Sequence, residues 1–340
     1  MRRLLVLALL VASCSPMSVA TRLLMASGGG ASYLAPSTPP FDNAWGAGHP
    51  AVFNVHGEPS AIFEGGIFRL WSGSYAPDAA HPGLEYSTST DGLTWTLVGN
   101  VLGQGAGGVA GDVLRGTVVK LGSTYYATYS AAGTDPNRDL AIATSSDGST
   151  WSYVGVLVAH NAVSGVEGWA NSTMFLDGST YYLMIEGHNT AISQWVIYLF
   201  SATSPLGPFS VLNGGNRLST LEQVVNGSTG GPTVTVINTT PTPKFGGVYH
   251  LWAHCQSTGS AIPTPTYHFT STDLINWTTT SPNPVFTGLP QAGTSPAWDQ
   301  TSDPAVLVVP GTGAFLFVGG GNNIDFSNNG IVTATAPATP

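Results

Sequence analysis

An internal repeat of 56 residues constrains this 340-residue chain more than any other feature of its sequence. The segment GSTYY at residues 122–126 recurs at residues 178–182, and the segment at residues 89–95 recurs at residues 145–151 with the same offset. A weaker copy of the second segment lies at residues 271–277. Such self-similarity is typical of arrays in which each unit buries its apolar faces only by packing against its neighbours.

Each repeat has the same internal order of short, β-rich runs. A first apolar strand is followed by a Gly turn, an aromatic strand, a polar loop, a third strand and an Asp-Gly or similar hairpin turn. Alternation over a few residues between such turns is a strand and hairpin signal, and no stretch shows helical periodicity. The sequence therefore predicts an all-β fold, a five-bladed β-propeller of four-stranded antiparallel blades, as a single domain over residues 31–340.

The ends and the turns of the repeats carry further expectations. The last repeat lacks an obvious fourth strand after residue 334, so we expect residues 31–41 to supply it and close the ring. Three recurring tryptophans are expected to seal one blade against the next: Trp95, Trp151 and Trp277. Asp91 and Asp147 are expected to cap their turns through side chain–backbone hydrogen bonds.

Composition excludes several classes of function. Charged residues make up only 8% of the chain, and nine Lys and Arg against 18 Asp and Glu give a net charge of −9. Because phosphate binding needs clustered cations, we expect no nucleic-acid partner. No histidine spacing resembles a zinc site, so no metal site is expected. Cys255 lies in an apolar run, which favours a buried structural thiol over a nucleophile.

The N-terminus has the features of a secretory signal over residues 1–20. Two arginines precede an apolar run at residues 4–12 that is too short to span a bilayer. Residues 11–14 match a lipobox, which would place a lipid on Cys14; ordinary cleavage after Ala20 and a start at Met17 are the alternatives. We expect an extracytoplasmic monomer, secreted or lipid-anchored at the cell surface, with membrane contact only through Cys14.

The chain resembles the five-bladed β-propeller glycosidases of families 43 and 32. The resemblance rests on the blade count, on the Ser-x-Asp-Gly-x-x-Trp turns, and on the segments at residues 58–62 (EPSAI) and 303–307 (DPAVL). The resemblance covers nearly all of the chain after residue 40. It implies hydrolysis of glycosidic bonds in poly- or oligosaccharides by carboxylates in an axial pocket, without a cofactor. An axial calcium ion is the alternative that it leaves open. The Asp turns also resemble the Asp boxes of sialidases, which need an arginine triad.

Aligning the repeats on the Gly turn gives one equivalent position per blade, at the start of the innermost strand. We call these the ring positions: Glu58, Arg115, Asn171, Gly231 and Asp303. In a propeller they should face the axial pocket. Glycoside hydrolysis needs two carboxyl groups, one protonated and one ionised. The resembled families carry acids on the first strands of blades one to three, so Arg115 and Asn171 depart from that pattern.

The candidate catalytic carboxylates are Glu58, Asp303, Asp112 and Glu167. The candidate substrate-binding residues are Arg115, Asn171, Trp169, His49 and Trp298. Each carboxylate also has a structural interpretation, as a strand-start or capping group for the first two and as a solvated loop residue for the others. Glu186, inside an aromatic strand, is interpreted as structural. Because Asn171 and Gly231 carry no acid, a non-catalytic carbohydrate-binding propeller, such as a surface lipoprotein or a phage-type particle component, is the alternative function.

Overall fold

The computed structural model describes most of the repeat region. The described residues are 49–50, 56–74, 83–103, 112–131, 137–225, 227–234, 243–257, 265–280, 283–286, 300–309, 312–321 and 330–337. All of them belong to one compact unit at residues 35–340. The predictions for the signal at residues 1–20, for Cys14, for residues 31–41 and for Trp298 fall outside them. In the described part of the chain, no helix has the length and apolar character needed to cross a membrane.

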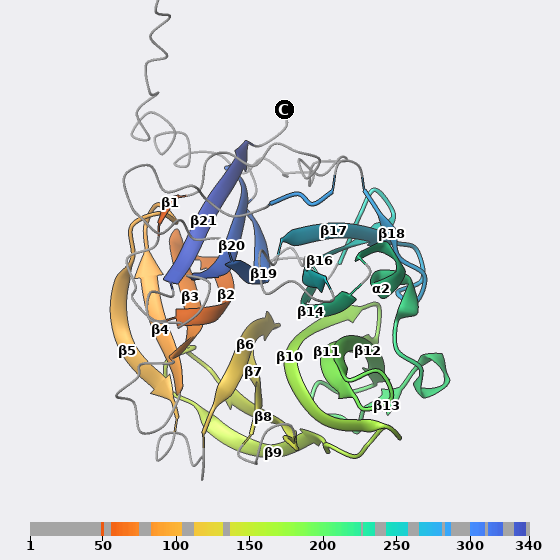
Figure 1. Cartoon of the computed structure of the whole chain (residues 1–340). Helices are drawn as coiled ribbons and strands as arrows, with labels where there is room; N and C mark the ends of the chain where they lie inside the picture. The colour runs from red at the N-terminus through yellow and green to blue at the C-terminus, as the bar shows by residue number, and fades with distance from the viewer. Residues whose placement is uncertain are drawn as a thin grey trace, which may run out of the picture. The chain divides into compact units, whose positions relative to one another are not determined.

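The described strands form five antiparallel sheets, which we call blades one to five in chain order (Figure 1). From inner to outer strand, blade one has β2 (His56–Glu64), β3 (Ile67–Ser74), β4 (Gly83–Ser89) and β5 (Thr96–Leu102). Blade two has β6 (Leu114–Leu121), β7 (Thr124–Ser130), β8 (Leu140–Ser145) and β9 (Ser152–Val158). Blade three has β10 (Val166–Asp177), β11 (Thr180–Asn189), β12 (Gln194–Ala202) and β13 (Ser210–Val211).

The last two blades are less regular. Blade four has β14 (Gly227–Val234), β16 (Val248–Ser257), β17 (Thr266–Ser271) and β18 (Thr278–Thr279), with β15 (Lys244–Phe245) paired to β16. Blade five has β19 (Gln300–Val309), β20 (Gly313–Gly321), β21 (Gly330–Pro337) and β1 (His49–Pro50). The 3-10 turn η1 (Asn213–Gly215) and the short helix α2 (Ser219–Val225) connect blades three and four.

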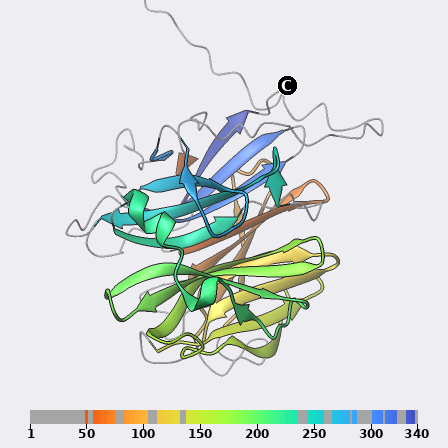
Figure 2. The ribbon, with the colours of Figure 1, turned by 90° about the vertical axis from the view of Figure 1, so that its right-hand side faces the viewer.

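The five inner strands surround one axis. Strand β2 contacts β6, β6 contacts β10, β10 contacts β14, β14 contacts β19, and β19 contacts β2, which completes the circuit (Figure 1). From the side, the yellow strands of blade two and the green strands of blade three lie next to each other (Figure 2). The predicted all-β propeller of four-stranded antiparallel blades is confirmed.

The outer strand of blade five comes from the N-terminal side of the chain. Strand β1 pairs with β21 through His49↔Thr333 and Pro50↔Val332. The sequence analysis predicted that residues 31–41 supply this strand, and the structure does not describe those residues. Strand β1 occupies the position of the fourth strand of blade five. His49 therefore lies in the outermost strand of its blade, with β21 and β20 between it and β19. The substrate-binding role of His49 stays a prediction.

The aspartate of each Ser-x-Asp turn caps that turn, as predicted. Asp91 Oδ1 accepts hydrogen bonds from the backbone N–H groups of Leu93 at 2.8 Å and Thr94 at 2.7 Å. Asp147 and Asp273 accept the equivalent pairs in their own turns. These donors favour the charged carboxylate and lower the pKa of Asp273 to about 2.

The recurring tryptophans seal adjacent blades, as predicted. The Trp95 ring meets the Phe317 ring of blade five edge-on at 5.8 Å between centroids. Trp151 lies in one buried cluster with Trp71 of blade one, and Trp277 packs in a cluster shared with blade three. Burying these large rings between sheets is what a blade needs, because its two faces are apolar.

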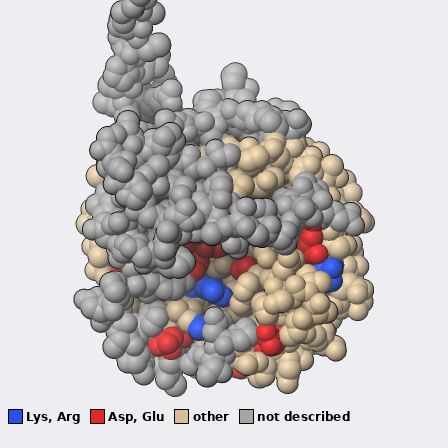
Figure 3. All heavy atoms as spheres, in the orientation of Figure 1, with Lys and Arg blue, Asp and Glu red and all other residues tan. Residues whose placement is uncertain are grey.

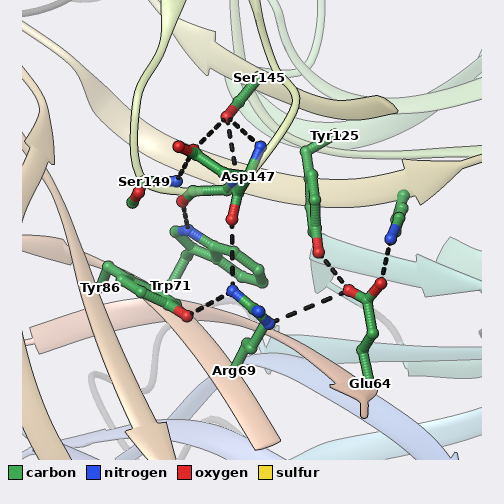
Figure 4. Close-up of polar contacts among 10 residues, drawn as sticks. Glu64, Arg69, Trp71, Tyr86, Tyr125, Ser145, Asp147 and Ser149 are labelled. Atoms are coloured by element: carbon green, nitrogen blue, oxygen red, sulfur yellow. Dashed lines mark hydrogen bonds and ion pairs between the residues drawn. The ribbon is translucent and has the colours of Figure 1, made fainter. Parts of the chain in front are cut away.

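Polar contacts fix the seam between blades one and two (Figure 4). The Trp71 indole N–H donates to the carbonyl oxygen of Gly148 at 2.8 Å. Arg69 donates to the Tyr86 hydroxyl at 2.7 Å and to the Asp147 carbonyl at 3.2 Å. The turn of blade two is therefore anchored to the aromatic strand of blade one, which fixes their inner strands relative to each other.

Cys255 is a buried thiol, as predicted, with 2% of its surface exposed. Burial raises the pKa of this thiol, because a thiolate would lack solvation there. A nucleophilic role is therefore excluded by its surroundings.

Candidate functional site

Each ring position falls at a break in strand register. The inner and second strands of every blade lose their regular pairing over the same short step, at Gly57/Ser60, Leu114/Thr117, Trp169/Ser172, Gly230/Thr233 and Ser302/Ala305. A β-bulge bends its strand and redirects the side chain next to it, and such bulges are frequent beside active sites. The sequence alignment thus identified one repeated structural feature in all five blades.

Four ring positions share a left-handed backbone. The φ angles are 48° at Glu58, 54° at Arg115, 57° at Gly231 and 51° at Asp303. Glycine adopts this conformation freely, whereas a residue with a Cβ atom pays roughly 1–2 kcal/mol. Three side chains are therefore held at the axis at a cost in stability, which is typical of functional sites.

An amide joins two carboxylates at the axis. Asn171 Nδ2 donates to Asp303 Oδ1 at 2.7 Å and to Glu186 Oε2 at 2.9 Å. Glu186 comes from β11, the second strand of blade three, and Asp303 from the inner strand of blade five. Both hydrogens of the amide nitrogen are used, and an aspartate in place of Asn171 could supply neither in its ionised form.

A histidine from blade four completes this group. His254, on β16, places Nδ1 3.3 Å from Asp303 Oδ1 and 3.1 Å from the Asp303 backbone nitrogen. Burial lowers the pKa of His254, but the negative charge of Asp303 and its contact with the imidazole outweigh burial and leave the pKa raised. The Asn171 amide and the His254 ring thus both contact Asp303 Oδ1. We call Asn171, Glu186, His254 and Asp303 the axial cluster.

The surroundings of Glu186 differ from those of Asp303, because they favour the neutral form of the carboxyl group. Only 6% of this residue is exposed. Burial raises the pKa of Glu186, and the nearby Asp303 charge adds to the shift, whereas His254 and Arg115 oppose it. The axial cluster thus combines two carboxyl groups in different environments, one buried with a raised pKa and one that accepts an N–H donor beside an imidazole. Such a divergence between neighbouring carboxyls is the arrangement that acid–base chemistry uses.

Glycine at the ring position of blade four is explained by its neighbours. A Cβ atom at Gly231 would lie 2.6 Å from Asp303 Oδ1 and 2.7 Å from His254 Nδ1. A Cβ atom at Gly230 would collide with Glu186 Oε1. Side chains from the other strands therefore occupy the volume that a blade-four side chain would need.

A second group of polar and aromatic side chains adjoins the axis at blade three. The Arg115 guanidinium carbon lies 5.1 Å from the centroid of the half-buried Trp195 ring. The His188 ring lies 5.2 Å from the same indole, and its Nδ1 is 2.6 Å from Glu167 Oε1. Acidic and basic atoms lie together near the middle of the face seen in Figure 3. Glu167 is therefore linked through His188 to the indole that Arg115 covers.

Trp169 packs inside its blade and is not part of the axial cluster. Trp169 is fully buried, donates from Nε1 to the Ala159 carbonyl at 2.7 Å, and packs edge-on against Tyr198 at 5.6 Å. No ring face remains open for a sugar, so the structure assigns Trp169 to blade packing instead of substrate binding. Asp112 is half-buried just before β6.

Four residues of the site were not identified as functional from the sequence: Glu186, His188, Trp195 and His254. They lie on second and third strands, whereas the alignment of repeats followed only the first strands. The signal for Glu186 was present, because an acid inside the apolar strand at residues 181–186 needs a partner when buried. Over the described residues, no group of three or more His, Cys, Asp and Glu side chains is placed to hold a metal ion.

Solved glycoside hydrolases have a similar fold. A thermostable family-43 glycoside hydrolase superposes with a TM-score of 0.64 and 17% identity, over 86% of this chain and 95% of that one. The catalytic domain of the GH62 α-L-arabinofuranosidase from Coprinopsis cinerea gives 0.62 and 11%, over 89% and 100%. The Bacillus subtilis arabinanase Arb43A gives 0.56 and 14%, over 84% and 95%. No family model and no curated protein matches the sequence. The chain therefore has the β-propeller fold that these glycoside hydrolases have.

Proposed function

We propose that this protein is a glycoside hydrolase-like propeller that acts on glycosidic bonds in poly- or oligosaccharides. The observation that carries the proposal is the axial cluster, in which burial raises the pKa of Glu186 close to Asp303, which accepts a hydrogen bond from Asn171 and contacts His254. Glycosidic bond hydrolysis requires one protonated and one ionised carboxyl group. The shared fold with enzymes named as arabinanase and α-L-arabinofuranosidase supports it.

The ring positions supply the leading residues of this proposal. Glu58 and Asp303 are the leading carboxylates, and Asp112 and Glu167 are supporting ones. Arg115 would hold a sugar hydroxyl or carboxylate through its planar fork of donors. Asn171 both orients Asp303 and faces the axis.

The test offers the protein arabinan, arabinoxylan and xylo-oligosaccharides and measures hydrolysis by the release of reducing sugar. We expect Glu58→Gln and Asp303→Asn each to lower kcat by about 100-fold or more while sugar binding persists, because each removes one acid–base group. Glu222→Gln is the matched control, because Glu222 lies on α2, pairs with Arg217 at 2.7 Å and is outside the axial cluster. Wild-type turnover in both axial variants would overturn the assignment.

A non-catalytic carbohydrate-binding propeller is the second candidate. It is favoured by Asn171 and Gly231, since neither side chain at these ring positions can transfer a proton. A glycan array read beside the reducing-sugar assay separates the two functions. Binding without release from any bound glycan would favour the binding module.

The N-terminal signal would place either activity outside the cytoplasm, on secreted or lipid-anchored protein. Fractionation of cells that express the full chain tests this part. Replacement of Cys14 by Ser should release protein from the membrane fraction if the lipobox is used, and should change nothing if it is not.

A further inference from the structure

We infer that Glu186, on the second strand of blade three, donates the proton to the leaving-group oxygen of the glycoside. The inference rests on the proposed function and names the acid of the same site. None of the ring positions in blades three and four carries an acid, so an acid on this side of the ring has to come from another strand.

The two oxygens of Glu186 have different surroundings. Oε2 accepts the hydrogen bond from Asn171, so a proton on the carboxyl group belongs on Oε1. Within the described residues, no hydrogen bond engages Oε1. That oxygen lies where a side chain of residue 230 would project, against the bare backbone of Gly230. Glu186, from the second strand of blade three, thus occupies the space that a side chain on the first strand of blade four would fill.

The groups that face Glu186 shift its pKa in both directions, and burial makes the net change a rise. Asp303 shares the Asn171 donor and repels a second negative charge nearby. His254 and Arg115 act in the opposite direction but do not overcome burial. Asp303 is therefore a positioning residue for the acid, and 14% of its side chain is exposed.

The proposed step balances with water as the only co-reactant. As the glycosidic C–O bond breaks, its electron pair stays on the leaving oxygen, which takes the proton from Glu186 Oε1 and departs as an alcohol. A water molecule adds its oxygen to the anomeric carbon and gives its proton to Glu58, the other leading carboxylate. Exchange with solvent restores a protonated Glu186 and an ionised Glu58.

The test compares two substrates of the same sugar. An oligosaccharide has a poor leaving group that needs protonation, whereas a dinitrophenyl glycoside has a leaving group that departs without it. We expect Glu186→Gln to lower kcat on xylo- or arabino-oligosaccharides by about 100-fold or more, and by less than about 10-fold on the dinitrophenyl glycoside. The variant should also lose the fall in rate that the wild type shows at high pH, because that fall reports loss of the acid proton.

Controls separate failure of this inference from failure of the proposed function. No hydrolysis of either substrate by the wild-type chain would overturn the proposed function itself. An active wild type with Glu58→Gln impaired on both substrates and Glu186→Gln unchanged would overturn the inference alone. Equal losses on both substrates in Glu186→Gln, with a lowered melting temperature, would indicate a structural role and also overturn it. Gly230→Ala, which displaces Glu186 Oε1, should reproduce the leaving-group dependence, and Glu222→Gln should not.

Discussion

At the scale of single residues, the structure explains why the ring position of blade three carries the amide Asn171 where the resembled families carry an acid. An acid was expected at this ring position by resemblance, and an Asn cannot transfer a proton. The structure places Asn171 between two carboxyl groups, where two N–H donors are required and a third acid would be repelled. The acid of this blade lies one strand further out, at Glu186.

The Asn171→Asp substitution should lower the free energy of unfolding by about 3 kcal/mol, because two hydrogen bonds to carboxyl groups are lost and a like charge is added. The pKa of the introduced carboxyl group in the folded state should be raised by Asp303 and by burial. The loss of stability relative to the wild type should then be smallest below the ordinary pKa of an aspartate, about 3.9, and should grow as the pH rises through the raised value. Melting curves at pH 5 and pH 8 check this, with exposed Asn161→Asp as the control. An equal loss at both pH values would contradict it.

At the scale of elements, the Ser-x-Asp turns and the bulges are the units that repeat. The turn could be predicted from sequence because its hydrogen bonds are local, within three residues of Asp147. The alignment of repeats could predict where each bulge lies but not its left-handed backbone, because that conformation follows from pairing with the second strand. Arg115 and Asp303 show no sequence signal for a positive φ, yet both adopt it.

Replacing Asp147 by Ala should lower the free energy of unfolding by about 1 kcal/mol, because the backbone N–H groups of Ser149 and Thr150 lose their acceptor. Asp147→Asn should lose less, since the amide oxygen can still accept both bonds. Chemical denaturation measures both variants against Ser146→Ala, an exposed neighbour in the same turn. A loss in Ser146→Ala as large as that in Asp147→Ala would show that the carboxylate is not the stabilising group.

At the scale of the whole molecule, the last blade is assembled from both ends of the described chain. Strands β19, β20 and β21 follow one another, and β1 completes the sheet from the N-terminal side. This pairing covers the edge of β21, which would otherwise present unpaired backbone groups.

Removal of residues 1–52 should therefore lower the melting temperature by several degrees relative to removal of residues 1–42, which leaves β1 in place. Circular dichroism melts of the two proteins measure the difference. Identical melting temperatures would contradict closure by β1, and a fall already present in the shorter deletion would assign part of the closure to residues 31–41.

The repeat in the amino-acid sequence was sufficient to predict the all-β propeller, the Asp-capped turns, the tryptophans between blades and the five ring positions. All of these depend on local pattern or on a period that recurs along the chain. The axial cluster depends on contacts between distant strands, such as Asn171 with Asp303 and His254 with Asp303. Trp169 and Trp195 have the same side chain, yet one is buried inside a blade and the other lies beside Arg115. Which polar groups meet at the axis follows from how five twisted sheets pack around it, because that packing brings second strands of different blades to one point.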